Sequence, residues 1–376
     1  MSGDPTSDRS PPRQPPTDAD TPADLPVSVV IPARDSAATL ADAVQAVVTQ
    51  RPAPVEVVIA VGPSRDDTAE VAARLAEEHP GLVRTVPNPS GRTPEALNIA
   101  IAATSGPVVA RVDAHCVLPT GYLAAALATL HRSGAGNVGA VQRPVAGSGF
   151  ARAVAAAMGS PLGTGGASYR AGQEAGPVDT AYLGVFRREA LEAVGGYDPT
   201  FVRNQDAELN LRLARAGYPV WLEPRMVVAY RPRGSVRALA RQYLGYGRWR
   251  RRTGRTHPGS LRPRQLIPPV VVVALGLSAV LSTALRDARP VALAGGGYLG
   301  VLTGAALRAA DGPRDVPGVA LALGTMHTSW GVGFLLGPPS EGATTAPAAA
   351  AVALVPGSPA HAGHDRPPGA VPGPRP

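Results

Sequence analysis

The sequence predicts an α/β fold in which helices flank a mostly parallel sheet, followed by C-terminal membrane helices. Between residues 27 and 113, apolar runs of strand length alternate with segments of helical periodicity. Gly and Pro stand at the boundaries between these segments. Residues 265–285 carry no charge, and about 20 apolar residues are enough to cross a hydrocarbon core of about 30 Å.

The first part of the chain alternates strand and helix in a regular order. Strands of apolar and β-branched residues are expected at 27–33, 55–62, 82–88 and 107–113. Helices are expected at 37–50, 66–80 and 93–104. The second helix ends at Pro80, and the third has Pro94 in its first turn after a Thr93 cap. In such sheets ligands bind at the carboxyl ends of the strands.

Composition limits the possible partners. The 376 residues have a net charge of +8, and arginine supplies every basic side chain apart from histidine. Cys116 is the single cysteine, which excludes an internal disulfide and fits a reducing compartment. Nucleic-acid binding is one interpretation of the basic run at 231–264. However, aromatic residues make up only 4% of the chain and gather beside the predicted span, so we expect no nucleic-acid partner.

The C-terminal part is predicted to associate with a membrane. We expect two to three transmembrane or membrane-associated helices within 265–336, of which 265–285 is the best candidate. The alternative is a buried helical subdomain. The basic aromatic segment at 233–264 then lies at the cytoplasmic surface as a positive-inside anchor. The Pro-rich ends, 1–25 and 337–376, are expected to be disordered tails, and no signal peptide is expected.

Two acidic positions are candidates for chemistry. Asp113 ends the fourth strand and His115 comes two residues later, and residues two apart in an extended stretch point to the same side. A carboxylate there suits Mg²⁺ or Mn²⁺ bound to phosphate oxygens, and imidazole tolerates Mn²⁺ better. The alternative is an Asp that caps a turn. Asp206 starts a helix that ends at Gly217; it is either an N-cap or a general base beside an acceptor hydroxyl.

Four stretches in this order resemble the family 2 glycosyltransferases of Rossmann-like GT-A fold: VSVVIPARDSAATLADAV, GPSRDDTAEVA, GRTPEALNIAIAATSGPVVARVDAHC and GGYDPTFVRNQDAELNLRLARAGY. The resemblance covers roughly residues 26–255. Within the family the chain is most similar to the membrane-anchored exopolysaccharide branch with the succinoglycan-type glucosyltransferases. That closer match is carried by VRNQDAELNLRL, RQYLGYGRWR and MHTSWGVGFLLG.

The resemblance implies roles for particular residues. Asp113 takes the first position of the family's metal-binding D-x-D motif and His115 the last, with Mn²⁺ or Mg²⁺ as the cofactor. Asp206 takes the position of the catalytic base. The residues implied in binding the nucleotide-sugar donor are Pro32, Arg34, Asp35, Asp66, Arg92, Asn98 and Asp113. Those implied at the acceptor side or the membrane interface are Gln205, Gln242, Arg248 and Trp249.

The sequence departs from the family at several positions. Gln205 replaces the first member of the acidic pair, and Val61 and Gly62 stand where an Asp contacts uracil. Gln242 and Arg248 are also too far apart for the Q-x-x-R-W motif of processive synthases. We therefore leave the nucleotide open and expect no processive polymerisation.

The resemblance implies a glycosyltransferase domain over 26–232 on the cytoplasmic side of the plasma membrane. The expected activity is inverting, metal-dependent transfer from a nucleotide-diphosphate sugar to a lipid-linked or glycan acceptor. The expected process is exopolysaccharide or cell-envelope polysaccharide biosynthesis. The alternative is a membrane-tethered, non-catalytic nucleotide-sugar-binding or scaffolding protein with a decayed transferase domain. It is motivated by His115, Gln205 and the Asp missing at 61–62.

Overall fold

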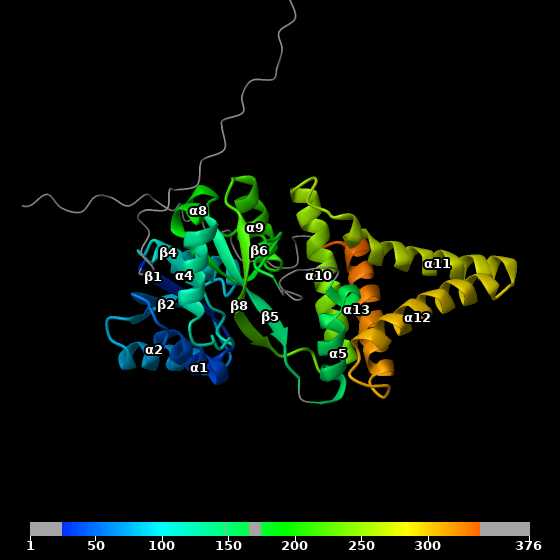
Figure 1. Cartoon of the computed structure of the whole chain (residues 1–376), viewed down its shortest axis with the longest axis horizontal. Coiled ribbons are helices and arrows are strands. Elements are labelled where there is room, and N and C mark those ends of the chain that lie inside the picture. Colours follow the sequence, from blue (N-terminus) through cyan, green and yellow to red (C-terminus); the bar gives the residue numbers. More distant parts are fainter. Residues whose placement is uncertain (1–24, 147, 165–173, 339–376) are drawn as a thin grey trace, which may run out of the picture.

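The computed structural model describes residues 25–146, 148–164 and 174–338. The tails predicted at 1–25 and 337–376 lie almost wholly outside these residues. Within them, an α/β body is followed by long apolar helices that project from one side (Figure 1).

One sheet organises the α/β body. Its strands are β1 (Val27–Ala33), β2 (Glu56–Val61), β3 (Val83–Pro87), β4 (Val108–Arg111), β5 (Asn137–Pro144), β6 (Gly176–Pro177), β7 (Tyr182–Arg187) and β8 (Val220–Tyr230). Among the described residues their order is β3-β2-β1-β4-β7-β5-β8-β6. The pairs β3–β2, β2–β1, β1–β4 and β5–β8 are parallel, whereas β7 runs antiparallel to β4 and β5. The predicted mostly parallel sheet is confirmed.

Helices cover both faces of this sheet. They are α1 (Ala37–Val48), α2 (Thr68–Glu78), α3 (Thr93–Ala102), α4 (Tyr122–Ser133), α8 (Arg188–Ala193) and α9 (Gln205–Arg215). Two further helices, α5 (Gly149–Gly159) and α6 (Pro161–Thr164), instead pack against the C-terminal helices. The helices α1, α2 and α4 share one buried apolar cluster, and α3, α8 and α9 share another. Along β4, Val108 and Ala110 enter the first cluster and Val109 enters the second, as the two-residue period of a strand requires.

The predicted elements up to residue 113 all form, and their ends differ from the prediction by at most two residues. One detail is wrong: Thr93 is not the cap of α3. Arg92 occupies the N-cap position without a side-chain capping bond, and Thr93 is the first helical residue. Pro94 does lie in the first turn, where its missing N–H has no helical partner to lose.

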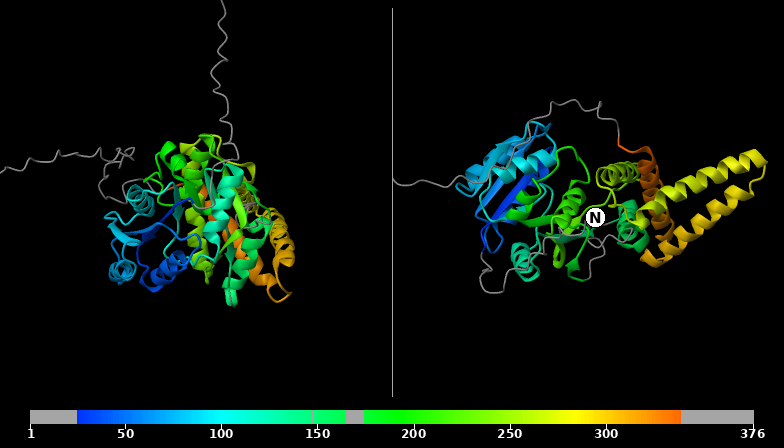
Figure 2. Two further views of the ribbon diagram at one scale, coloured as in Figure 1. Left: turned by 60° about the vertical axis from the view of Figure 1, so that its left-hand side comes forward. Right: turned by 90° about the horizontal axis from the view of Figure 1, so that it is seen from above.

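The remaining helices form the C-terminal part. They are α10 (Val236–Thr256), the short 3₁₀ helix η1 (Pro263–Leu266), α11 (Ile267–Leu285), α12 (Arg289–Ala309) and α13 (Val316–Leu336). A third apolar cluster joins α5, α10, α12 and α13. By length and composition, three helical segments among the described residues could cross a bilayer: Pro263–Leu285, Arg289–Ala309 and Val316–Leu336. Both figures show α11 and α12 extending away from the body as a hairpin (Figures 1 and 2).

Candidate active site

The strand β4 ends on a buried arginine. Arg111 is only 4% exposed, and it lies on the same face as Val109, which is the face covered by α9. A guanidinium in such a place needs carboxylate partners, because an uncompensated buried charge is strongly destabilising. Its Nε donates to Asp113 Oδ1 at 2.9 Å, and its Nη1 donates to Asp206 Oδ1. Arg111 therefore joins two acids that lie far apart in the sequence.

This arrangement fixes the charge of Arg111. Burial acts to lower the pKa of the guanidinium, but Asp113 and Asp206 outweigh it and hold that pKa above its usual range. The guanidinium carbon also lies 5.9 Å from the centre of the Tyr197 ring, a cation–π distance. Arg111 is thus a permanent cation at the carboxyl end of β4.

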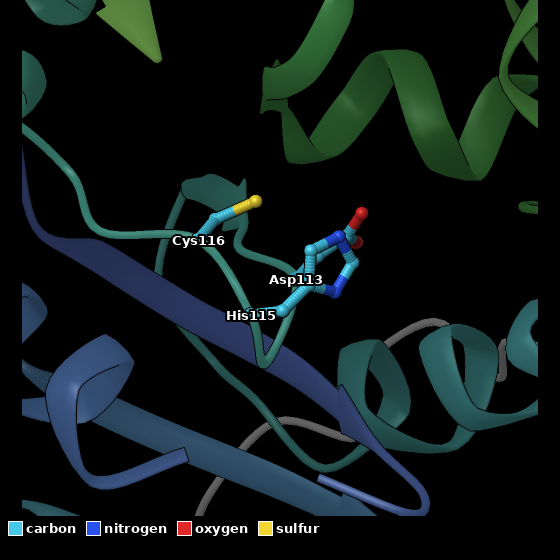
Figure 3. Close-up of side chains that lie close together, drawn as sticks. All are labelled: Asp113, His115 and Cys116. Carbon is cyan, nitrogen blue, oxygen red and sulfur yellow. The ribbon is translucent and has the colours of Figure 1, made fainter. Parts of the chain in front are cut away.

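Asp113 belongs to a turn rather than to an extended stretch. The Cys116 amide donates to the Asp113 carbonyl at 2.9 Å, so the prediction that Asp113 and His115 meet through strand geometry is wrong. The turn brings them together instead. The ligand atoms of Asp113, His115 and Cys116 all lie within 4.8 Å of one another. Figure 3 shows the imidazole of His115 beside the Asp113 carboxylate.

Two of these three groups suit a divalent cation. The Asp113 carboxylate is half-buried and His115 is exposed, and oxygen with imidazole nitrogen fits Mn²⁺. Cys116 does not fit. Burial raises the pKa of its thiol to about 12, so the sulfur keeps its proton at neutral pH, and it lies 3.1 Å from the Tyr182 hydroxyl. The thiolate is the metal-binding form of cysteine.

Asp206 lies in the first turn of α9. The N-cap is Asn204, which has a left-handed backbone with φ of 64°. The interpretation of Asp206 as an N-cap is therefore wrong. The Asp206 side chain keeps 33% of its surface exposed, so an acceptor can reach it. Burial raises the pKa of Asp206, Arg111 opposes this effect, and Asp113 adds to it, so that the pKa lies above the ordinary value. A carboxylate with a raised pKa is a stronger base.

The C-terminal end of α10 holds the segment around Asp206. The Asn204 side-chain Nδ2 donates to Thr253 Oγ1 at 3.0 Å. The rings of Phe201 and Trp249 lie 6.1 Å apart. One turn into α9, the buried Glu208 lies 2.9 Å from His257 Nε2 just after α10. The position of α9 therefore depends on contacts with the predicted interfacial segment.

Loops after β1, β2 and β3 meet at the same end of the sheet. The Arg34 guanidinium donates to the Gly91 carbonyl at 3.1 Å. Asp35 has φ of 47° and pairs with Arg65 at 3.0 Å, and hydrogen bonds from the Arg65 backbone and side chain lower the pKa of Asp35. A Cβ atom on Gly62 would lie 3.1 Å from Gly91 Cα. This close approach gives a steric reason why Gly stands here.

Four other predicted donor residues make contacts within the fold. The Asp66 carboxylate accepts from the Ala37 amide at 3.0 Å and from Thr68, which links the starts of α1 and α2. The Asn98 side chain exchanges hydrogen bonds of 2.7 and 2.8 Å with the Tyr197 backbone. Arg92 pairs with Glu95, and Pro32 lies within β1. Direct donor contacts by these residues stay predictions.

The predicted acceptor-side residues lie on two helices. Gln205 is the first residue of α9. On α10, Gln242 donates to the Tyr230 hydroxyl at 2.9 Å and to the Tyr246 hydroxyl at 2.8 Å. Among the described residues, the buried Arg248 Nε has no hydrogen-bond partner. Trp249 packs against Phe201, which lies shortly before α9 in the chain. Of these α10 residues, Trp249 therefore contacts the residue closest in sequence to Asp206.

The sequence profile described as "Glycosyltransferase like family 2" matches residues 22–250, which include all of the site residues predicted from the sequence. The chain belongs to glycosyltransferase family 2. It is 35% identical over 283 residues to the succinoglycan biosynthesis protein ExoA of Rhizobium meliloti (strain 1021), a match that covers 74% of this chain and 84% of that protein.

Two further relatives of this glycosyltransferase are more distant. One is the dolichyl N-acetyl-alpha-D-glucosaminyl phosphate 3-beta-D-2,3-diacetamido-2,3-dideoxy-beta-D-glucuronosyltransferase of Methanococcus voltae. It is 25% identical over 199 residues, or 51% of this chain and 62% of that one. The other is the structure of the mannosyltransferase PcManGT from Pyrobaculum calidifontis in complex with GDP-Man and Mn²⁺. It has a TM-score of 0.53 at 23% identity and covers 83% of this chain and 86% of that one. This likeness shows a shared GT-A fold.

Sequence reasoning missed two residues at the centre of this glycosyltransferase site. Arg111 was not expected to connect the acids, and Cys116 was not expected beside Asp113. A signal for Arg111 was present, because an arginine that ends a buried apolar strand needs acidic partners nearby. Its neighbour Asp113 was visible in the sequence, but Asp206 lies 95 residues away.

Proposed function

We propose that this enzyme transfers one sugar from a nucleotide-diphosphate sugar, with inversion, to a lipid-linked or glycan acceptor in exopolysaccharide or cell-envelope polysaccharide biosynthesis. The observation that carries the proposal is the pairing of Arg111 with both Asp113 and Asp206. It brings a donor-side carboxylate and a base-side carboxylate to one place, at the end of the sheet where ligands of α/β folds bind. The name of the ExoA relative supports the polysaccharide process.

Asp206 acts as the general base in this proposal. The acceptor hydroxyl gives its proton to the partly exposed Asp206 carboxylate as the oxygen attacks the anomeric carbon. Attack from the face opposite the leaving diphosphate inverts the configuration and needs no nucleophile from the enzyme. The raised pKa of Asp206 supports this role. Arg111 keeps the carboxylate in place and limits the rise of its pKa.

Asp113 and His115 are the residues that hold a divalent cation, and their ligand atoms lie close enough for one ion. Such an ion supplies a positive charge for the leaving diphosphate. Arg111 contributes a fixed positive charge behind the Asp113 carboxylate, since its Nε is bonded to Oδ1. The bound Mn²⁺ and GDP-Man in the PcManGT structure support this class of donor and cofactor.

The membrane helices support an acceptor presented at a membrane surface. The name of the Methanococcus voltae relative includes a dolichyl-linked sugar phosphate, and this supports a lipid-linked acceptor. The contacts between α10 and the segment before Asp206 support a base that acts beside the basic interfacial segment. We expect the catalytic domain to face the cytoplasm at the plasma membrane.

The experiment uses the full chain in nanodiscs with Mn²⁺ or Mg²⁺ and separate UDP-, GDP- and dTDP-sugars. A membrane lipid extract from cells that produce the polysaccharide supplies the acceptors. We expect cation-dependent release of nucleoside diphosphate from one donor, matched by label in the glycan or lipid fraction. The anomeric configuration of the product is read by NMR. Donor binding without transfer or hydrolysis under any of these conditions would instead support a non-catalytic binding protein.

A further inference from the structure

The three apolar helices of the C-terminal part are not equally buried. Only 6% of the most apolar stretch of α11 and 11% of that of α12 are buried, against 33% for α13. The exposed large apolar side chains follow the same division. They lie mainly on α11 and α12: Ile267, Val270, Val273, Leu277, Val280, Leu281, Leu285, Val291, Leu293, Leu299, Val301 and Leu307. On α13 they are Leu321, Leu335 and Leu336. The hairpin lacks a protein partner over most of its surface, whereas α13 has one.

The partners of α13 run along its whole length. Near its start, Gly318 contacts Ala153 of α5. In the middle, His327 Nε2 lies 3.0 Å from the Leu162 carbonyl of α6. These contacts are with the folded body. Towards the hairpin, a Cβ atom on Gly331 would lie 2.8 Å from Val272 of α11, and one on Gly324 would lie 3.2 Å from Leu302 of α12.

Near its end α13 packs directly on α10. A Cβ atom on Gly333 would lie 2.1 Å from the Leu244 carbonyl, and one on Gly247 would lie 2.0 Å from the Trp330 carbonyl. The Arg251 guanidinium donates to the Phe334 carbonyl at 3.1 Å. The two backbones touch at these glycines, so any placement of α13 also places α10.

This packing conflicts with α13 as a membrane span. If α13 crossed a bilayer, it would carry α10 beside it into the hydrocarbon. That helix holds exposed Arg237, Arg241 and Arg255 besides Arg251. Arginine is among the least favourable residues at a bilayer centre. The length and composition of α13 permit a span, but its neighbours do not.

The hairpin has the dimensions and charges of a membrane insertion. At about 1.5 Å per residue, the 19 residues of α11 and the 21 of α12 extend about 28 and 31 Å, close to a hydrocarbon core of about 30 Å. Charged residues stand only at its two ends. Arg286, Asp287 and Arg289 form the tip, and Arg264 and Arg308 lie at the base. Figures 1 and 2 both show the hairpin leading away from α10 and α13.

We infer that α11 and α12 are the two membrane spans of this enzyme, and that α13 stays on the side of the catalytic domain as part of the folded body. The hydrocarbon core of the bilayer covers the exposed apolar surface of the hairpin. Seven arginines lie between residues 248 and 264, before the hairpin, whereas two lie at its tip. The end of the hairpin that joins the folded body therefore faces the cytoplasm. The end of α13 and the catalytic domain then share one side. This inference holds whichever sugar the enzyme transfers.

The experiment is single-cysteine labelling in sealed membrane vesicles of both orientations, with a membrane-impermeant maleimide. The natural cysteine, Cys116, is 2% exposed, so the unchanged chain is the unlabelled control. Val55→Cys reports the catalytic side, Ala288→Cys the tip of the hairpin, and Leu336→Cys the end of α13; all three positions are exposed. An epitope tag after Pro376, probed by added protease, gives a second measurement of the C-terminal side.

We expect Val55→Cys and Leu336→Cys to react in the same vesicle orientation and Ala288→Cys in the other. The tag is then digested in the orientation in which Val55→Cys reacts. Reaction of Leu336→Cys together with Ala288→Cys, or digestion of the tag on that side, would mean three spans and overturn the inference. Reaction of all three cysteines in one orientation would mean that the hairpin does not cross the bilayer, which also overturns it.

Discussion

Replacement of Arg111 tests how the two carboxylates are held. A hydrogen bond to a charged group contributes roughly 1.5–3 kcal/mol. Lysine keeps the charge, but its single ammonium lacks the planar fork that reaches Asp113 and Asp206 together. Loss of one of the two contacts predicts a fall in kcat/KM of roughly 10- to 100-fold, at about 1.36 kcal/mol per tenfold change in rate. Arg111→Met leaves two carboxylates without their shared cation and is expected to lose more.

The pH profile separates positioning from simple damage to the fold. A general base acts when deprotonated, so activity rises with pH through the pKa of Asp206. Arg111 lowers that pKa against the effect of burial. In Arg111→Met the acid limb of kcat/KM is therefore expected to move to higher pH, whereas Arg111→Lys keeps it closer to the wild-type position.

The assay is transfer by the full chain over a range of pH, with melting curves for each variant. Arg74→Met is the matched control, because Arg74 is exposed and its pair with Glu78 is long at 3.9 Å. Its profile is expected to match the wild type. An Arg111→Met enzyme with a wild-type rate and an unmoved acid limb would refute the role given to Arg111.

Two further predictions concern stability. Burial acts to raise the pKa of Glu56, but hydrogen bonds from Ser105, Ser28 and Arg84 outweigh it and lower the pKa from 4.5 to about 2. The ionised Glu56 therefore stabilises the fold by about 3 kcal/mol above pH ~4.5, and this stabilisation is lost as the pH falls through about 2. Glu56→Gln is expected to lower the Tm at pH 7 by several degrees, with a gap to wild type that closes on acidification; a gap constant with pH would contradict this. Gly247→Ala is expected to separate α10 from α13 and lower the Tm, because its Cβ would meet the Trp330 carbonyl. Gly276→Ala, with no atom within 4 Å of its Cβ, should leave the Tm of the detergent-solubilised chain unchanged, and equal effects of the two would contradict the packing.

The first half of the sheet was predictable because its signals are local. The strands β1, β2 and β4 are mainly apolar runs, β3 is short and rich in β-branched residues, and each helix between them has its own period or boundary residue. The second half was less accessible. The strand β7 follows β6 in the chain but inserts between β4 and β5 as an antiparallel neighbour, and pairings of this kind depend on distant residues rather than on local pattern.

The site shows the same limit. Asp113 and Asp206 could be selected from motifs, but their link through Arg111 is a tertiary contact. Asn98 resembles a donor-binding residue, yet its amide is bonded to the backbone of Tyr197. Sequence spacing cannot tell which polar group the fold itself will use. The same holds for α13, whose composition matches a membrane span while its packing against α10 does not.

The central claim is that Asp206 is the base while Asp113 serves the donor. The most direct measurement is single-turnover transfer by Asp206→Asn beside donor binding by calorimetry, with Asp42→Asn on the exposed face of α1 as the control. We expect transfer to fall by about 10²- to 10⁴-fold, the usual contribution of a general base, while donor affinity stays at the wild-type value. Asp113→Asn should weaken donor binding. Transfer by Asp206→Asn at a rate near that of Asp42→Asn would contradict the account.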